Sequence, residues 1–78
     1  MAVRAWVLIQ TEVGKAAHVA AQVAGLEGVI SAADVTGPYD VIVEAEADSL
    51  DDLGRLVVSR LQLTDGTTRT LTCPIVQL

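Results

Sequence analysis

The segment Val35–Val43 places a tight turn between two short apolar runs and constrains the fold more than any other part of the chain. Gly37 permits backbone angles and close approaches that a Cβ would forbid, and Pro38 fixes φ at the next position of the turn. Asp40 then stands where the turn becomes a strand, so we expect its carboxylate at the rim of a sheet. A carboxylate in this position binds a ligand or caps the backbone of the turn.

The hydrophobic periodicity of the whole chain predicts six elements of secondary structure, two of which are the strands on either side of this turn. Alternating residues predict four strands, over Val3–Gln10, Val29–Val35, Asp40–Glu46 and Thr67–Leu78. Apolar residues at i, i+3, i+4 and i+7 predict a helix over Val13–Ala24, with Gly25 as its stop signal. A second helix is expected after Asp48-Ser49.

The start of the second helix carries a capping pattern. Ser49 is the expected N-cap, and Asp52 stands three residues later, where an acidic side chain can reach back to the cap. Asp51 is placed to pair with Arg55 one turn further on. The expected buried stripe of this helix is Leu50, Leu53, Val57 and Leu61.

The resulting order, β-α-β-β-α-β, predicts a single α+β domain over residues 1–78 with the ferredoxin-like arrangement. In this fold a four-stranded antiparallel sheet carries both helices on one face. The other face would be bare and would show Trp6, Leu8 and Ile42. Because 51% of the 78 residues are hydrophobic, more than one small core easily hides, we expect that face to be buried in a homo-oligomer.

Charge and cysteine content exclude several classes of protein. The net charge is −5 and the five basic residues are scattered, so direct binding of nucleic acid is not expected. No segment has the pattern of a signal peptide or the length of a membrane span, which predicts a cytoplasmic protein that binds no membrane. The single cysteine, Cys73, excludes an intrachain disulfide and a multi-cysteine zinc site, and its apolar neighbours predict burial.

Three segments together resemble the C-terminal regulatory domain of the Lrp/AsnC transcription factors, often called the RAM domain. They are Val35–Asp40, the strand opening Ala5–Ile9 and the ending Thr68–Thr72. Full regulators carry a helix-turn-helix domain before the first strand, whereas Met1 stands only two residues upstream of it here. The resemblance therefore implies a stand-alone module that cannot read DNA by itself.

The same resemblance implies how the module works. Family members form dimers through their sheets, and the dimers associate into octamers or rings. Small effectors, typically amino acids, bind between dimers near the Gly-x-Tyr-Asp turn. A full-length regulator of the family, joined through matching sheet faces, is a further expected partner.

Four residues form the expected ligand site: Gly37, Tyr39, Asp40 and Thr70. Asp40 would accept the α-ammonium group of an amino acid, while backbone N–H groups around Gly37 hold its carboxylate. Tyr39 either walls the pocket or packs in an oligomer interface, and Thr70 either binds the ligand or is simply a good strand former. Arg69 points to the opposite face of its strand, where we expect a surface or intersubunit ion pair.

Catalysis, metal binding and a cofactor are not expected. The only histidine, His18, lies on the polar side of a helix, and no nucleophile–base arrangement or Gly-x-Gly-x-x-Gly loop is present. The acidic residues at 48, 51 and 52 fit the first turn of a helix better than a metal site. Two alternatives to the regulatory module stay open: a purely structural assembly or adaptor domain, and a small dimeric enzyme of the same fold.

Overall fold

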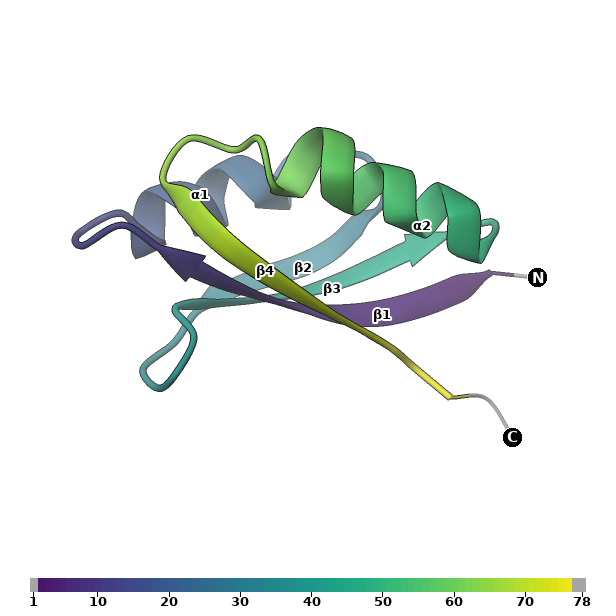
Figure 1. The fold of residues 1–78 in the computed structure, drawn as a ribbon, viewed down its shortest axis with the longest axis horizontal. Coiled ribbons are helices and arrows are strands. Elements are labelled where there is room, and N and C mark those ends of the chain that lie inside the picture. The colour runs from purple at the N-terminus through teal and green to yellow at the C-terminus, as the bar shows by residue number, and fades with distance from the viewer. Residues whose placement is uncertain (1, 77–78) are drawn as a thin grey trace.

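The computed structural model describes residues 2–76 and has the predicted order of elements (Figure 1). The elements are β1 (Val3–Thr11), α1 (Ala16–Ala24), β2 (Val29–Asp34), β3 (Val41–Ala47), α2 (Leu50–Leu56), the π-helical turn η1 (Val57–Leu61) and β4 (Thr67–Pro74). The strands form one antiparallel sheet in the order β2-β3-β1-β4. Both helices lie on the same side of this sheet (Figure 1). The ferredoxin-like α+β fold is therefore confirmed.

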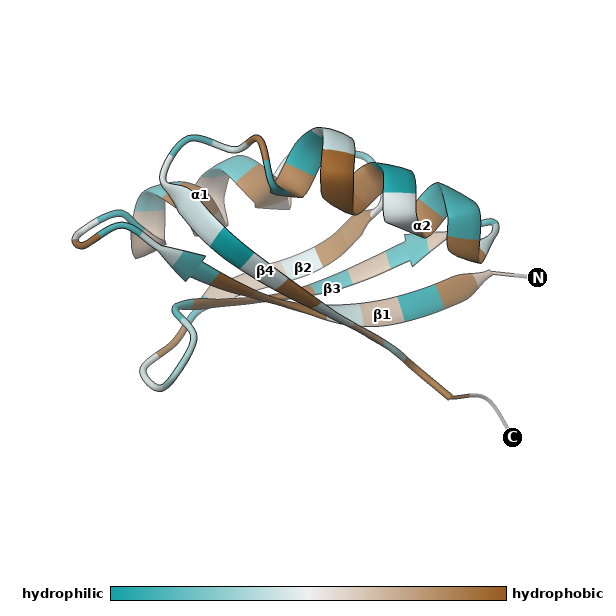
Figure 2. Cartoon of the chain, viewed as in Figure 1, coloured by the Kyte–Doolittle hydropathy of each residue, from teal (hydrophilic) through white to brown (hydrophobic). Residues whose placement is uncertain are grey.

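Alternation along the strands sends every second side chain into the core under the helices, and Figure 2 shows apolar and polar positions interleaved along them. The central strands β1 and β3 supply half of the core. Twelve hydrophobic residues are buried: Ala5, Val7, Ile9, Val19, Ala20, Val23, Val41, Val43, Ala45, Leu53, Val57 and Leu61. No polar or charged residue is buried among the described ones. Apolar burial of this kind is the main term that stabilises a small domain.

The sheet face away from the helices, called the open face below, carries an apolar row across all four strands. Leu8 pairs with Leu71 on one side and with Ile42 on the other, and Ile42 pairs with Ala33. Residues directly opposite each other on neighbouring strands share a face. The structure thus places Leu8 and Ile42 side by side on the open face, as the alternation predicts.

Trp6 lies on the open face in the next row, between its register partners Glu44 and Cys73. The indole is 44% exposed, which confirms the predicted placement of Trp6 on the uncovered side. The expected burial of Cys73 is wrong, since the residue is exposed. Its apolar neighbours in sequence do not decide its burial, because the strand period turns it toward the side that no helix covers.

The first helix starts later than predicted. Val13 was expected to open it, but this side chain is fully exposed and α1 begins at Ala16. Gly14 has φ 81°, and the Lys15 N–H donates to the carbonyl oxygen of Glu12 (3.0 Å). Residues 12–15 therefore form a turn. The prediction included part of this turn in the helix because Val13 fits the apolar periodicity of the residues that follow.

In the second helix the predicted N-cap is confirmed, whereas the predicted partner of Asp52 and the predicted burial of Leu50 are wrong. Ser49 is the N-cap, and its Oγ accepts a hydrogen bond from the Asp52 N–H (3.1 Å). The Asp52 carboxylate was expected to reach back to this cap but binds Arg55 (3.0 Å), the partner expected for Asp51. Leu50 is 61% exposed and not part of the buried stripe, because the first residue of the helix lies beside the exposed β3–α2 connection.

Smaller differences concern the strand ends. The last strand was expected to run to Leu78 but ends at Pro74, one residue before the Ile75 N–H makes a last hydrogen bond to the carbonyl oxygen of Arg4 (2.8 Å), and residues 77–78 lie outside the described residues. The bounds of the first three strands differ from the expected ones by at most one residue at either end. Within residues 2–76, none of the helices has the length and hydrophobicity needed to span a membrane.

The corrected stripe of α2 leads to a prediction from a matched pair of leucines. Leu53→Ala should lower the free energy of unfolding by about 2–5 kcal/mol, because Leu53 is 1% exposed and leaves a cavity. Leu50→Ala should change it by about 0.5 kcal/mol or less. Urea denaturation of both variants measures the difference, and equal losses would show that Leu50 is buried in solution.

Candidate functional site

The turn between β2 and β3 is fastened to the end of β1 through Asp40. The backbone of Asp40 donates to the carbonyl oxygen of Ile9 (2.9 Å) and accepts from the Val35 N–H (2.8 Å). Its side-chain Oδ2 accepts from the Thr11 N–H (2.8 Å). Asp40 therefore holds three segments together: the end of β1, the end of β2 and the start of β3.

A second link joins the turn to the open face. The side-chain amide of Gln10 donates to the carbonyl oxygen of Pro38 (3.2 Å). The carbonyl oxygen of Gln10 in turn accepts from the Thr68 hydroxyl (3.2 Å). A continuous path of hydrogen bonds thus runs from β4 through the end of β1 to the 35–40 turn.

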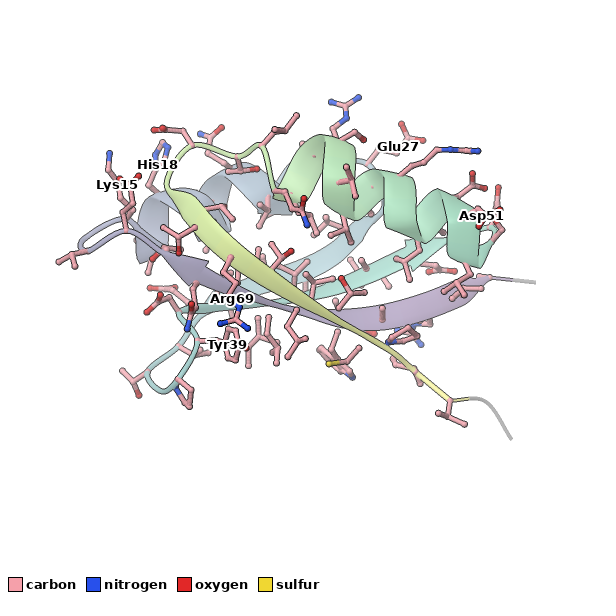
Figure 3. The ribbon with its side chains drawn as sticks, viewed as in Figure 1. Lys15, His18, Glu27, Tyr39, Asp51 and Arg69 are labelled. Carbon is pink, nitrogen blue, oxygen red and sulfur yellow. The ribbon has the colours of Figure 1, made fainter. Side chains whose placement is uncertain are left out.

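Gly37 is required at its place in the turn by its backbone angle. Its φ is 144°, a conformation that residues with a Cβ rarely adopt, whereas a Cβ built there would meet nothing within 4 Å. The space beside Gly37 is therefore open, and a ligand can approach its backbone. Figure 3 shows that Tyr39, two residues on, lies on the side of the sheet away from the helices.

The structure brings three of the four predicted site residues together, since Gly37, Tyr39 and Asp40 share the turn. It places Thr70 elsewhere. Thr70 pairs with the core residue Ile9, so it faces the helices, and its Oγ1 accepts from the Gln62 side-chain amide (3.1 Å). Its role in ligand binding stays a prediction.

Asp40 shows the capping role that was one of its two expected readings, and it keeps capacity for a second role. Oδ2 binds the Thr11 N–H, while no hydrogen bond to Oδ1 occurs among residues 2–76. An ionised carboxylate can accept several hydrogen bonds. Asp40 is half-buried, so part of the residue stays accessible from solvent.

The residues that hold the turn, Gln10 and Thr11, were not singled out from the sequence. They lie 28 and 29 residues from their partners in the turn, and no local pattern marks such contacts. Their place at the end of β1 could have indicated the contact, because the end of β1 must lie next to the start of β3 in this topology.

A groove of about 850 Å³ lies at the opposite end of β3, about 20 Å along the strand from the turn. It is lined by the α1–β2 connection, the start of β2, the end of β3 and one side of α2 and η1. Its charged residues are Glu27, Glu46, Asp48, Asp52 and Arg60. None of the predicted site residues borders it. The described part of the chain holds no group of three or more His, Cys, Asp or Glu residues placed to bind a metal ion.

The family model of the Lrp/AsnC ligand-binding domain matches residues 4–77. The chain belongs to this family. The resemblance seen in the 35–40 turn and in the first and last strands is thereby confirmed over nearly the whole sequence. No curated protein matches the chain.

Solved structures extend the comparison of this Lrp/AsnC domain. TTHA0845 from Thermus thermophilus is 25% identical with a TM-score of 0.90, and the match covers 97% of this chain and 95% of that one. Escherichia coli AsnC is 22% identical with a TM-score of 0.88, over 97% of this chain and 52% of AsnC. The Neisseria meningitidis transcriptional regulator NMB0573, in complex with L-Met, is 18% identical with a TM-score of 0.83, over 96% of this chain and 50% of that one.

The chain thus matches TTHA0845 almost end to end and spans about half the length of the two regulators. The likeness to AsnC and NMB0573 shows a shared fold. Together with the family model, it shows that this domain has the architecture of the effector domains of regulators.

The capping bond of Asp40 leads to a prediction about stability. Asp40→Ala should lower the free energy of unfolding by about 1 kcal/mol, because the Thr11 N–H loses its acceptor. Asp40→Asn keeps an oxygen at the same place and should recover most of this loss. Urea denaturation of both variants measures the effect, and a fully stable Asp40→Ala protein would show that the bond does not hold the turn.

Proposed function

We propose that this domain is a non-catalytic, oligomeric regulatory module that binds an amino acid at the 35–40 turn. Asp40 accepts the α-ammonium group, backbone N–H groups near Gly37 face the carboxylate, and Tyr39 walls the site. The module needs no cofactor or metal and acts in the cytoplasm. The observation that carries the proposal is the Lrp/AsnC ligand-binding family model, which matches residues 4–77.

The geometry of the turn supports this assignment. Gly37 leaves its surroundings open, and Asp40 has an oxygen without a hydrogen bond among the described residues, beside a fixed backbone. A hydrogen bond between an ammonium group and a carboxylate is among the stronger polar contacts in proteins. The L-Met bound by the Neisseria regulator is an amino acid of the proposed class.

The openness of the turn also supports a link between binding and assembly. The groove at the far end of β3 and a second one on α2 and η1, at Asp51, Gly54, Arg55, Val58 and Ser59, do not include a turn residue. The space beside Gly37 is open, and in this proposal another copy supplies the walls that enclose an amino acid there. Ligand binding would then favour the assembled state, because the complete site exists only there.

The open face gives the assembly its contact surface. Trp6, Leu8 and Ile42 would pack against a second copy to form a dimer, and dimers would associate further into octamers or rings. A full-length Lrp/AsnC regulator is the second proposed binding partner of this domain, since the effector domain of the regulator would present a matching sheet face. With a net charge of −5, direct binding to nucleic acid is not part of the proposal.

A purely structural adaptor domain is the second candidate function. The observation in its favour is the Thr11–Asp40 hydrogen bond, which gives the turn carboxylate a role without any ligand. This candidate predicts that the chain oligomerises normally and binds no amino acid.

The test combines thermal unfolding with sedimentation in the presence of each of the twenty proteinogenic amino acids. A specific ligand at about 100 Kd should stabilise the fold by about 2.7 kcal/mol and raise Tm by several degrees. We expect one amino acid, or a few related ones, to do so and to change the size of the assembly.

Asp40→Asn is the decisive variant, because it removes the charge and keeps an acceptor for the Thr11 N–H. It should abolish the rise in Tm, while Asp51→Asn, the same change at an exposed position on α2, should retain it. If no amino acid raises Tm of the wild-type protein, the proposed function is wrong and the adaptor is favoured. An undiminished rise in Asp40→Asn would move the site away from the turn.

A further inference from the structure

Arg69 stands on the open face close to the 35–40 turn. Its register partner is Gln10, and the Gln10 side chain donates to the carbonyl oxygen of Pro38. Figure 3 shows Arg69 and Tyr39 on the same side of the sheet, away from the helices. Arg69 therefore lies next to a residue that holds the turn, although Asp40 and Arg69 are 29 positions apart in the sequence.

Arg69 and Asp40 flank the end of β1 from its two sides. Arg69 is on β4, beside Gln10, and Asp40 precedes Val41, the β3 partner of Ile9. Strands two apart in a sheet are separated by about 10 Å. The long side chain of Arg69 can span part of this distance, so a small molecule that lies over the end of β1 would be within reach of both charges.

The two charges are opposite in sign and neither is neutralised by an ion pair among the described residues. Within residues 2–76 the ion pairs are Arg4–Glu44, His18–Asp65 and Asp52–Arg55. Arg69 and Asp40 take part in none of them. An amino acid carries a carboxylate and an ammonium group on one carbon atom, so a cation and an anion on the two sides of the end of β1 match its two charges.

We infer that Arg69 is the residue that binds the α-carboxylate of the amino acid, opposite Asp40. This assignment rests on the proposed function and adds to it a residue from another strand. Guanidinium groups bind carboxylates through two parallel hydrogen bonds, which fix orientation as well as charge. Backbone N–H groups near Gly37 face the same carboxylate, and Arg69 adds a charge that makes the site specific for a free carboxylate.

The experiment compares amino acids with their α-carboxamides, which keep the ammonium group and the side chain and lose the negative charge. The probes are the twenty L-amino acids and the corresponding L-amino acid amides, titrated individually at about pH 6.5, where their amino groups are protonated. Isothermal titration calorimetry gives Kd for the wild-type protein, Arg69→Gln, Arg69→Lys and Arg60→Gln. Arg60→Gln is the matched control, because it makes the same charge change at the groove at the far end of β3.

We expect the wild-type protein to bind its amino acid at least about tenfold more tightly than the amide. Arg69→Gln should weaken binding of the acid by about tenfold or more and leave binding of the amide within about twofold, so that the preference disappears. Arg69→Lys should restore part of the preference, and Arg60→Gln should behave as wild type. Equal thermal stability of the four proteins would exclude a folding defect as the cause.

Two results would overturn the assignment alone: equal affinity of the wild-type protein for acid and amide, or unchanged affinity of Arg69→Gln for the acid. In both cases an amino acid still binds, so the proposed function stands. If none of the twenty amino acids binds the wild-type protein, the proposed function fails and the role of Arg69 fails with it.

Discussion

Both helices pack on the same face of the sheet, and the rest of the molecule depends on this one-sided cover. The buried core of the described residues lies between the covered face and the helices, with Val7, Ile9 and Val43 in the two central strands. The open face leaves Trp6 and Leu71 each 44% exposed in a chain of 78 residues. A domain this small buries only about 60% of the surface of its extended chain, so an apolar sheet face left in water is a substantial loss of stabilisation. In the proposed assembly a second copy of the chain would recover that loss, and the amino-acid site is proposed at the rim of the same face.

The turn and the open face are parts of one hydrogen-bonded structure. Gln10 belongs to the open face and its side chain holds Pro38, while the next residue, Thr11, holds Asp40. Packing of a second sheet on the open face would press on Gln10 and on its neighbour Arg69, and so on the geometry of the turn. In the same way, a ligand between Arg69 and Asp40 would stiffen the rim that the second copy contacts. Ligand binding at the turn and assembly through the open face would thus influence each other through Gln10 and Thr11 at the end of β1.

The sequence alone predicts the fold because its signals are local. Alternation and helical periodicity determine the six elements, and Ser49 marks the start of α2 through its own hydroxyl. Errors arise where a local signal has two interpretations. Val13 continues the apolar pattern of α1 but lies in a turn made by Gly14, and Cys73 has apolar neighbours but faces the open side. The site is half predictable: Gly37, Tyr39 and Asp40 lie within four residues of sequence, whereas Gln10 and Thr11 reach the turn, and Arg69 reaches Gln10, through the packing of strands.

Sedimentation velocity over a range of concentrations tests most directly the claim that the open face is a contact between copies. The wild-type protein should sediment as a dimer or larger at micromolar concentration, and Leu71→Glu, which puts a charge into the apolar row, should sediment as the 8.2 kDa monomer. Leu63→Glu is the control, because Leu63 is 76% exposed and lies outside the sheet, and it should leave the assembly intact. A wild-type protein that is monomeric at every concentration, or a Leu71→Glu variant that assembles as wild type does, would contradict the account.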